Sequence, residues 1–193
     1  MSRNRVYLIT GANRGIGRGL VERYLSCSST TVIAAVRNVD HPTTKSLAAL
    51  SKADSSELIV LKIDSNSETD AEHATRRLVT EFGISHLDVV IGNAGICKAY
   101  TSVACSTTAA MNEHFAINAL GPLILFQAVH QLLRKSKNGK FVAISSLAAS
   151  VGKMEIVPVY HVVYGVSKGA LNHITRRVHF EHPALTVFSI DPG

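Results

Sequence analysis

The amino-acid sequence predicts an α/β protein in which a doubly wound parallel sheet lies between two layers of helices. Short runs rich in β-branched residues alternate with longer segments of helix-like spacing. The short runs are apolar at almost every position, as strands buried on both faces are. This alternation requires right-handed crossovers, which place helices on both faces of the sheet. With 193 residues, we expect one domain spanning residues 1–193.

Six apolar runs are the expected strands of a three-layer α/β/α arrangement. They are VYLIT at 6–10, TVIAAV at 31–36, LIVLKI at 58–63, LDVVIG at 87–92, KFVAIS at 140–145 and LTVFSI at 185–190.

The segments between these runs predict five helices. Ser67, followed three residues later by Asp70, resembles a helix start signal. The expected helices cover residues 16–26, 43–53, 67–82, 107–135 and 162–181.

Composition limits the classes of protein to consider. Hydrophobic residues make up 46% and charged residues 18% of the chain, a globular balance without a compositional break that would mark a linker. No apolar run reaches the roughly 18 residues of a membrane span, and the start MSRNRVYLIT lacks a signal-peptide pattern. Cys27, Cys97 and Cys105 are odd in number and lack C-x-x-C spacing. We therefore expect a cytoplasmic protein without a membrane partner.

The basic charge balance raises the alternative of a nucleic-acid partner. Lys and Arg number 20 against 14 Asp and Glu, for a net charge of +6. The basic residues are scattered in pairs such as Arg76-Arg77, without a basic arm or an aromatic-interleaved patch, which favours a solvated surface. We expect no nucleic-acid partner.

The nine histidines raise the alternative of a metal site. The nearest pattern is His179-Phe180-Glu181-His182, which is not H-E-x-x-H and is followed by Pro183. It is better interpreted as the end of a helix, and no metal is expected.

A glycine-rich turn follows the first expected strand. In TGANRGIGRGL, Gly11, Gly15 and Gly17 lie between a strand and an amphipathic helix. Glycines allow a sharp turn and close backbone approach, and the helix start presents unpaired N–H groups to a pyrophosphate. The pattern predicts a Rossmann-like, dinucleotide-binding loop.

The end of the second strand indicates which dinucleotide binds. Arg37 occupies the place where a site that prefers NAD carries an acid, and Arg14 lies inside the glycine loop. Two guanidiniums suit a 2′-phosphate, which favours NADP(H) over NAD(H). Asp40, three residues after Arg37, keeps NAD(H) as the weaker alternative.

The stretch YHVVYGVSK contains two tyrosines and a lysine. On a helix, Lys168 shares a face with Tyr164, four residues before it, whereas Tyr160 has no such cation. An ammonium beside the phenol favours the phenolate and should lower the pKa of Tyr164 toward a useful acid–base range. Tyr164 is therefore the expected catalytic phenol.

Four motifs, in order along the chain, resemble those of the short-chain dehydrogenase/reductase family. They are T-G-x-x-x-G-x-G at Thr10, Gly11, Gly15 and Gly17; N-A-G at Asn93, Ala94 and Gly95; Y-x-x-x-K at Tyr164 and Lys168; and P-G at Pro192 and Gly193. The resemblance runs from about residue 5 to the last residue. Within the family, VYLITGANRGIGRGL, SETDA, HLDVV, YGVSK and HFE resemble the fungal norsolorinic acid ketoreductase group, with small carbonyl reductases as a broader neighbour.

The resemblance implies roles for single residues. Asp64 would meet the adenine amino group, Asn118 would hold a water of a proton relay, and Ser146 would orient the substrate, although spacing alone does not separate it from Ser145. Tyr164 and Lys168 complete the catalytic set. The implied cofactor-binding set is Thr10, Gly11, Asn13, Arg14, Gly15, Ile16, Gly17, Arg37, Asp64, Asn93, Ala94, Gly95, Tyr164, Lys168, Pro192 and Gly193.

The implied chemistry is reduction of a ketone or aldehyde by hydride transfer from NADPH. Negative charge then develops on the carbonyl oxygen, so donors must be aimed there beforehand. Tyr164 would act as general acid, with Lys168 lowering its pKa and binding the nicotinamide ribose. The resemblance also implies a homodimer or homotetramer formed through helices 107–135 and 162–181.

The sequence departs from the family pattern at two places. Residues 147–163 form a long connection containing Pro158, interpreted as a reshaped substrate rim, with Tyr160 as a pocket wall or core aromatic. The sequence stops at P-G, whereas family members continue with a nicotinamide-contacting segment, a lid and a further strand. We therefore expect the sixth strand to lie at a sheet edge. The alternative to an active ketoreductase of polyketide metabolism is an NADP-binding remnant impaired in turnover.

Overall fold

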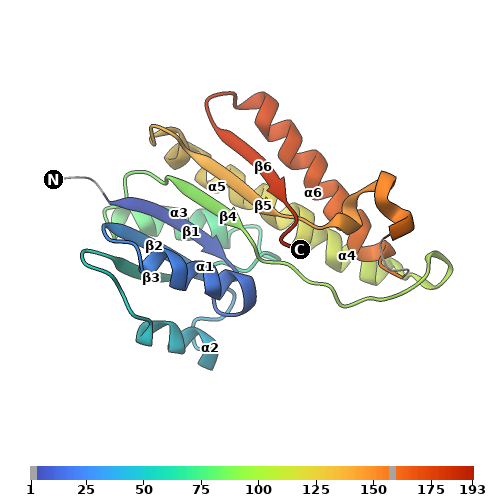
Figure 1. Ribbon diagram of the computed structural model, residues 1–193, viewed down its shortest axis with the longest axis horizontal. Coiled ribbons are helices and arrows are strands. Elements are labelled where there is room, and N and C mark those ends of the chain that lie inside the picture. Colours follow the sequence, from blue (N-terminus) through green and yellow to red (C-terminus); the bar gives the residue numbers. More distant parts are fainter. Residues whose placement is uncertain (1–3, 157–159) are drawn as a thin grey trace.

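The fold is a six-stranded, entirely parallel sheet between two layers of helices, as the sequence predicts (Figure 1). The computed structural model describes residues 4–156 and 160–193. The strand order is β3-β2-β1-β4-β5-β6, so β6 lies at one edge of the described sheet and pairs with β5. The strands are β1 (Arg5–Thr10), β2 (Thr30–Val36), β3 (Glu57–Lys62), β4 (Val89–Gly92), β5 (Lys140–Ile144) and β6 (Thr186–Ile190).

The helices agree with the predicted ranges except after the second strand. The α-helices are α1 (Gly15–Leu25), α2 (Pro42–Lys45), α3 (Asp70–Thr80), α4 (Thr108–Phe115), α5 (Gly121–Arg134) and α6 (Val162–Glu181). Short 3-10 turns are η1 (Ser46–Ala49), η2 (Val103–Cys105), η4 (Leu147–Ala149) and η5 (Val151–Ile156).

The predicted helix over 43–53 is wrong. α2 is a single turn that begins after His41, whose ring accepts the Thr43 N–H, and η1 continues it. The backbone becomes extended at Leu50. Leu47 is the fully buried apolar side chain of these two turns, so little tertiary packing supports a longer helix.

The predicted helix over 107–135 is one continuous run in three parts. α4 and α5 are joined by a π-helical segment, η3 (Ala116–Leu120), which contains Asn118. By length and composition, this run from Thr108 to Arg134 could cross a membrane, with a mean hydropathy of 1.4 in its most apolar window. The sequence analysis did not identify this segment as a possible membrane span, because it looked for an unbroken apolar run. Half of that window is buried inside the protein, as expected for a helix packed on a sheet.

Two apolar cores lie on opposite faces of the sheet. The larger one combines inward side chains of the strands with residues of α3, α5 and α6. The smaller one packs Val21 and Leu25 of α1 and Leu47 of η1 against β1 and β2. The central strand β1 is buried from Val6 to Thr10, so both cores hold it in place.

The strand order reverses between β1 and β4, which are neighbours in the sheet. In an open parallel sheet, the loops that leave the carboxyl ends of such neighbours run in opposite directions and leave a crevice. The topology therefore places the glycine loop after β1 and the Asn93-Ala94-Gly95 loop after β4 on either side of one crevice.

Truncation of a β1 core residue tests this packing. Leu8 is fully buried in the larger core, so Leu8→Ala should lower the free energy of unfolding by about 3 kcal/mol through lost burial and a residual cavity. Urea denaturation followed by circular dichroism measures the change. Val79→Ala on exposed α3 surface is the control and should cost well under about 1 kcal/mol. Equal effects of the two substitutions would contradict the assignment of Leu8 to the core.

Candidate functional site

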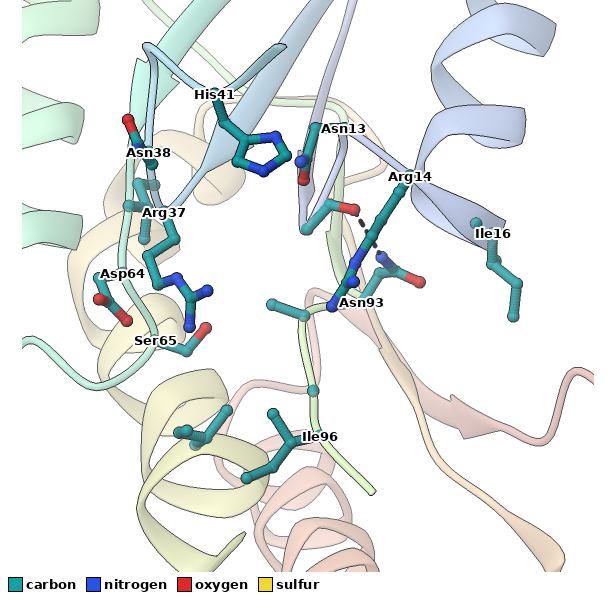
Figure 2. A pocket seen from close by; sticks show the side chains of 16 residues that line it. Asn13, Arg14, Ile16, Arg37, Asn38, His41, Asp64, Ser65, Asn93 and Ile96 are labelled. Carbon is teal, nitrogen blue, oxygen red and sulfur yellow. Dashed lines mark hydrogen bonds between the residues drawn. The ribbon is translucent and has the colours of Figure 1, made fainter. Parts of the chain in front are cut away.

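A cavity of about 420 Å³ opens at the carboxyl ends of β1, β2 and β4 (Figure 2). Most of the residues predicted to bind a dinucleotide line it. Those residues are Gly11, Asn13, Arg14, Gly15, Ile16, Arg37, Asp64, Asn93, Ala94 and Gly95. Thr10 and Gly17 support its floor rather than line it.

The floor of the cavity depends on close backbone approach at Gly17. A Cβ at this position would run into the carbonyl group of Gly11 and lie 2.6 Å from Asn93 Nδ2. Arg14 precedes α1 in an extended conformation, and its side chain makes no capping bond. The first N–H groups of α1 therefore face the cavity side of the loop without a side-chain cap, which suits an anionic ligand.

Hydrogen bonds from Thr10 and Asn93 hold the two loops together. Thr10 Oγ1 accepts the N–H groups of Asn93 and Ala94, each at 3.0 Å. Asn93 Nδ2 donates to the Thr10 carbonyl at 2.8 Å and to the Gly11 carbonyl at 3.4 Å, the second of which is drawn in Figure 2. These bonds explain the positions of Thr10 and Asn93 in the predicted set, because both residues shape the cavity through its backbone.

Two arginines reach into the cavity from opposite walls (Figure 2). Arg14 extends from the glycine loop and Arg37 from the end of β2. Neither guanidinium has a hydrogen-bond or ion-pair partner among residues 4–156 and 160–193. Asp40, the residue that kept NAD(H) as an alternative, does not line the cavity and lies 3.7 Å from Lys45 Nζ. The cavity wall at β2 is therefore cationic.

His41 is a lining residue that the sequence analysis missed. Its Nδ1 lies 2.8 Å from Thr43 Oγ1, which accepts a hydrogen bond from Asn13 Nδ2 at 2.6 Å. The Thr43 hydroxyl proton is thus free to bond His41 Nδ1, and the Thr43 N–H donates there too at 3.3 Å. This chain of bonds joins the glycine loop to α2 and leaves His41 Nε2 as a donor at the cavity rim. The sequence signal that could have identified His41 is its position directly before Pro42, where the residue that caps a helix stands.

Asp64 lines the cavity beside Arg37, where the resemblance places it. Its Oδ1 accepts the Asn66 N–H at 3.0 Å, and its own N–H donates to Asp70 Oδ2 at 3.0 Å. The Asp70 carboxylate also accepts from Lys62 Nζ at 3.4 Å, and the Asp70 N–H donates to Ser67 Oγ at 3.1 Å, so the predicted start signal of α3 also fixes the loop that carries Asp64.

A second cavity of about 210 Å³ adjoins the first through the loop after β4, because Ile16, Asn93, Gly95 and Ile96 line both. It contains the predicted catalytic pair. Its remaining lining residues are Cys97, Ile144, Ser145, Tyr164, Lys168 and Pro192. Gly193 of the predicted set lines neither of these two cavities.

Tyr164 and Lys168 share a face of α6, but the expected effect on the tyrosine pKa is wrong. Lys168 Nζ lies 5.7 Å from the Tyr164 ring centroid and donates to the Ile144 carbonyl at 2.7 Å. Burial raises the pKa of Tyr164, Cys97 raises it further, and the Ser146 hydrogen bond lowers it. Burial also lowers the pKa of Lys168 to about 8. Desolvation, the largest cause of both shifts, therefore sets their direction, in place of the ion pairing that the four-residue spacing suggested.

The structure separates the two serines after β5. Ser145 is buried, and its Oγ donates to Asn172 Oδ1 at 2.7 Å. Ser146 faces the Tyr164 phenol and lowers its pKa, and the Ser146 Oγ accepts the Ala148 N–H at 3.2 Å. Ser146 is thus the serine that meets the phenol.

Asn118 lies fully buried in the π-helical segment, with its side-chain amide engaged by protein groups. Its Oδ1 accepts the Ile96 N–H at 2.8 Å, and its Nδ2 donates to the Ile96 carbonyl at 2.8 Å and to Ser167 Oγ at 3.0 Å. The side chain fixes the loop between the two cavities. Its part in a proton relay stays a prediction.

The long connection before α6 leads from the turn that carries Ser146 to the helix that carries Tyr164. It contains η4 and η5, while residues 157–159, with the predicted Pro158, lie outside the described residues. Tyr160 is 55% exposed and has φ of 75°, so it is neither a core aromatic nor a member of the Tyr164–Lys168 face. In Figure 1 this connection lies beside the loop after β4, and an isolated bridge joins Thr101 to His161.

The comparisons with known proteins agree with this geometry. A family model described as short chain dehydrogenase matches residues 5–193. The chain belongs to the short-chain dehydrogenase family. The resemblance predicted from four motifs is confirmed.

Curated relatives and a solved structure refine the placement within the short-chain dehydrogenases. Norsolorinic acid ketoreductase of Aspergillus parasiticus is 41% identical, over 97% of this chain and 70% of the relative. The protein of the same name from Dothistroma septosporum is 42% identical, over 100% of this chain and 72% of the relative. NADPH-bound carbonyl reductase from chicken fatty liver superposes with a TM-score of 0.87 at 26% identity, covering all of this chain and 77% of that one.

The lowered pKa of Lys168 predicts how stability changes with pH. Between about pH 8 and the unfolded value near 10.4, the unfolded chain binds more protons than the native one, so stability should rise by about 3 kcal/mol. The difference between the unfolding free energies of the protein and of Lys168→Met, measured by urea denaturation without added cofactor, isolates this rise. Lys137→Met removes an exposed ammonium and is the control. Parallel pH curves for the protein and Lys168→Met would contradict the burial effect.

Proposed function

We propose that this short-chain dehydrogenase is an NADP(H)-dependent reductase of ketones or aldehydes, with Tyr164 as the general acid. The observation that carries the proposal is the junction of the two cavities at Asn93, Gly95 and Ile96. One end of the joined space holds two unpaired guanidiniums, and the other holds a half-buried phenol. A dinucleotide laid along it would have its adenosine end at Arg37 and its nicotinamide end at Tyr164.

The residues of the larger cavity fit such a cofactor. The start of α1 and the close approach at Gly17 suit the pyrophosphate. Arg14, Arg37 and the His41 Nε2 donor suit a 2′-phosphate on the adenosine ribose. Asp40, the acid that follows β2, does not line the cavity, which disfavours NAD(H). Asp64 lies where it can accept from the adenine amino group. The NADPH-bound carbonyl reductase of similar fold supports the preference.

The residues of the smaller cavity fit proton donation to a carbonyl oxygen. Bound NADPH supplies the hydride. Ser146, which follows the lining residue Ser145, faces the Tyr164 phenol, and the two hydroxyls form a pair of donors for the oxygen on which charge develops. The raised pKa of Tyr164 keeps this phenol protonated, as a general acid requires. Lys168, held by the Ile144 carbonyl, lies behind the phenol and can bind ribose hydroxyls.

The rim of the smaller cavity favours a bulky apolar substrate. Exposed apolar side chains gather on the loop after β4 and on η5, the two segments that the Thr101–His161 bridge joins. They are Tyr100, Val103, Val151, Met154 and Ile156. Together with the two norsolorinic acid ketoreductases among the relatives, this rim supports an aromatic ketone of fungal polyketide metabolism as the substrate class.

Arg37 should determine the cofactor preference. Loss of a charge-assisted hydrogen bond to phosphate costs about 1.5 to 3 kcal/mol, so Arg37→Ser should weaken NADPH binding about tenfold to a hundredfold and leave NADH binding nearly unchanged. Calorimetric titration with each cofactor measures both affinities. The control is Arg134→Ser at the far end of α5, which removes the same charge and should alter neither. Equal losses for NADPH and NADH would contradict 2′-phosphate recognition by Arg37.

Substitution of each tyrosine should identify the catalytic phenol. Tyr164→Phe removes the proton donor and should lower kcat by about a hundredfold to ten-thousandfold without weakening NADPH binding. NADPH oxidation with a panel of aromatic and quinone ketones measures the effect. Tyr160→Phe, at the exposed rim, is the matched control and should retain kcat within about threefold.

The outcomes separate the proposed reductase from its alternative. Turnover abolished only in Tyr164→Phe supports the reductase. NADPH binding without turnover in the unsubstituted protein would instead support a cofactor-binding protein impaired in catalysis.

A further inference from the structure

Asp191, which follows β6, ties the end of that strand to the turn that carries Ser146. The Ser145 N–H donates to the Ile190 carbonyl at 2.7 Å, which extends the β5–β6 pairing to the edge of the turn. Asp191 is the next residue after Ile190, and its Oδ2 accepts the Leu147 N–H at 3.0 Å. The Asp191 carboxylate therefore holds η4 at its first residue, directly after Ser146.

η4 in turn packs against the helix turn that carries Tyr164. A Cβ at Gly165 would lie 2.6 Å from the Ala148 carbonyl oxygen, so the glycine permits direct contact between α6 and η4. Ser146 Oγ accepts the Ala148 N–H within the turn, and the Ser146 hydroxyl faces the Tyr164 phenol. A displacement of η4 would therefore move the Ser146 hydroxyl relative to the phenol.

Several ionisable groups face the Tyr164 phenol from the surrounding elements. Cys97 and Tyr100 approach from the loop after β4, Asp191 from the end of β6, and Lys168 from α6 itself. Burial raises the pKa of Tyr164 most, Cys97 raises it next, Ser146 lowers it, and the Asp191 and Tyr100 charges raise it. The Asp191 carboxylate is the one carboxylate of the described residues in this group.

We propose that Asp191 is a positioning residue for the Ser146–Tyr164 pair, clamping η4 through the Leu147 N–H and placing a negative charge near the phenol. The proposal rests on the proposed function, because it assigns Asp191 a part in keeping the general acid protonated and aimed. The clamp fixes where the proton donors point. The charge disfavours the tyrosinate, which extends the pH range over which Tyr164 carries its proton.

Two substitutions separate the clamp from the charge. Asp191→Asn keeps a side-chain oxygen that can accept the Leu147 N–H but removes the negative charge. Asp191→Ala removes both. Asp54→Asn, an exposed carboxylate in the turn before β3 at the opposite end of the sheet, is the control for net charge.

The ionisation of Tyr164 can be measured without cofactor or substrate. The chain has five tyrosines and no tryptophan, so near-ultraviolet absorbance reports tyrosinate formation directly. The difference in absorbance between each protein and the same protein carrying Tyr164→Phe isolates the ionisation of Tyr164. Asp191→Asn and Asp191→Ala should both move the ionisation of Tyr164 to lower pH, and Asp54→Asn should not. An ionisation pH unchanged in Asp191→Asn would overturn the proposal, whether or not the protein proves to be a reductase.

Reductase activity provides the second measurement. In Asp191→Asn, the decline of kcat at high pH should begin at lower pH, because reduction requires protonated Tyr164, while kcat at neutral pH stays within about threefold. In Asp191→Ala, kcat should also fall about tenfold or more at neutral pH, because the donors lose their alignment. Equal kcat in Asp191→Ala and the unsubstituted protein would overturn the clamp. Absence of turnover in the unsubstituted protein would count against the proposed function only, since the tyrosinate titration still tests Asp191.

Discussion

The hydrogen bonds between Thr10 and the Asn93-Ala94 backbone are the constraint on which the rest of the site depends. They join the carboxyl ends of β1 and β4, the two central strands from which the chain departs in opposite directions. The Asn93 side chain then bonds the glycine loop, whose own path requires Gly17. With these loops fixed, the larger cavity opens toward Arg37 on one side, and the Gly95–Cys97 segment continues into the smaller cavity on the other. Asn118 holds that continuation by both backbone groups of Ile96.

Desolvation controls the chemistry of the smaller cavity. Lys168 is almost completely buried, with the Ile144 carbonyl as its acceptor, and its pKa falls to about 8. Tyr164 is half-buried, and its pKa rises. Both shifts favour the neutral form, as burial in a low dielectric requires. The phenol therefore keeps its proton, as the proposed reduction of a carbonyl group requires.

Nearly all of the fold could be predicted from the sequence, because continuous apolar strands alternating with amphipathic segments admit few arrangements. The predicted helix over 43–53 was wrong because the two short turns α2 and η1 bury one large apolar side chain, Leu47, and end where the backbone extends at Leu50. Arg14 and Arg37 line the larger cavity, as their places in the glycine loop and at the end of the second strand predicted, and Asp64 lines it as the resemblance implied. His41 and Asp191 were missed because their roles depend on the Asn13–Thr43 bond and on the turn after β5, contacts between segments far apart in sequence. The predicted lowering of the Tyr164 pKa was wrong because residue spacing carries no information on burial.

Transfer of deuterium from NADPH labelled at C4 of the nicotinamide to an aromatic ketone tests the central claim most directly. If the two cavities form one path from Arg37 to Tyr164, the alcohol product of the unsubstituted protein should carry deuterium on its carbinol carbon, and Tyr164→Phe should form almost none of it. Product without deuterium at that carbon, or labelled product formed equally well by Tyr164→Phe, would contradict the account.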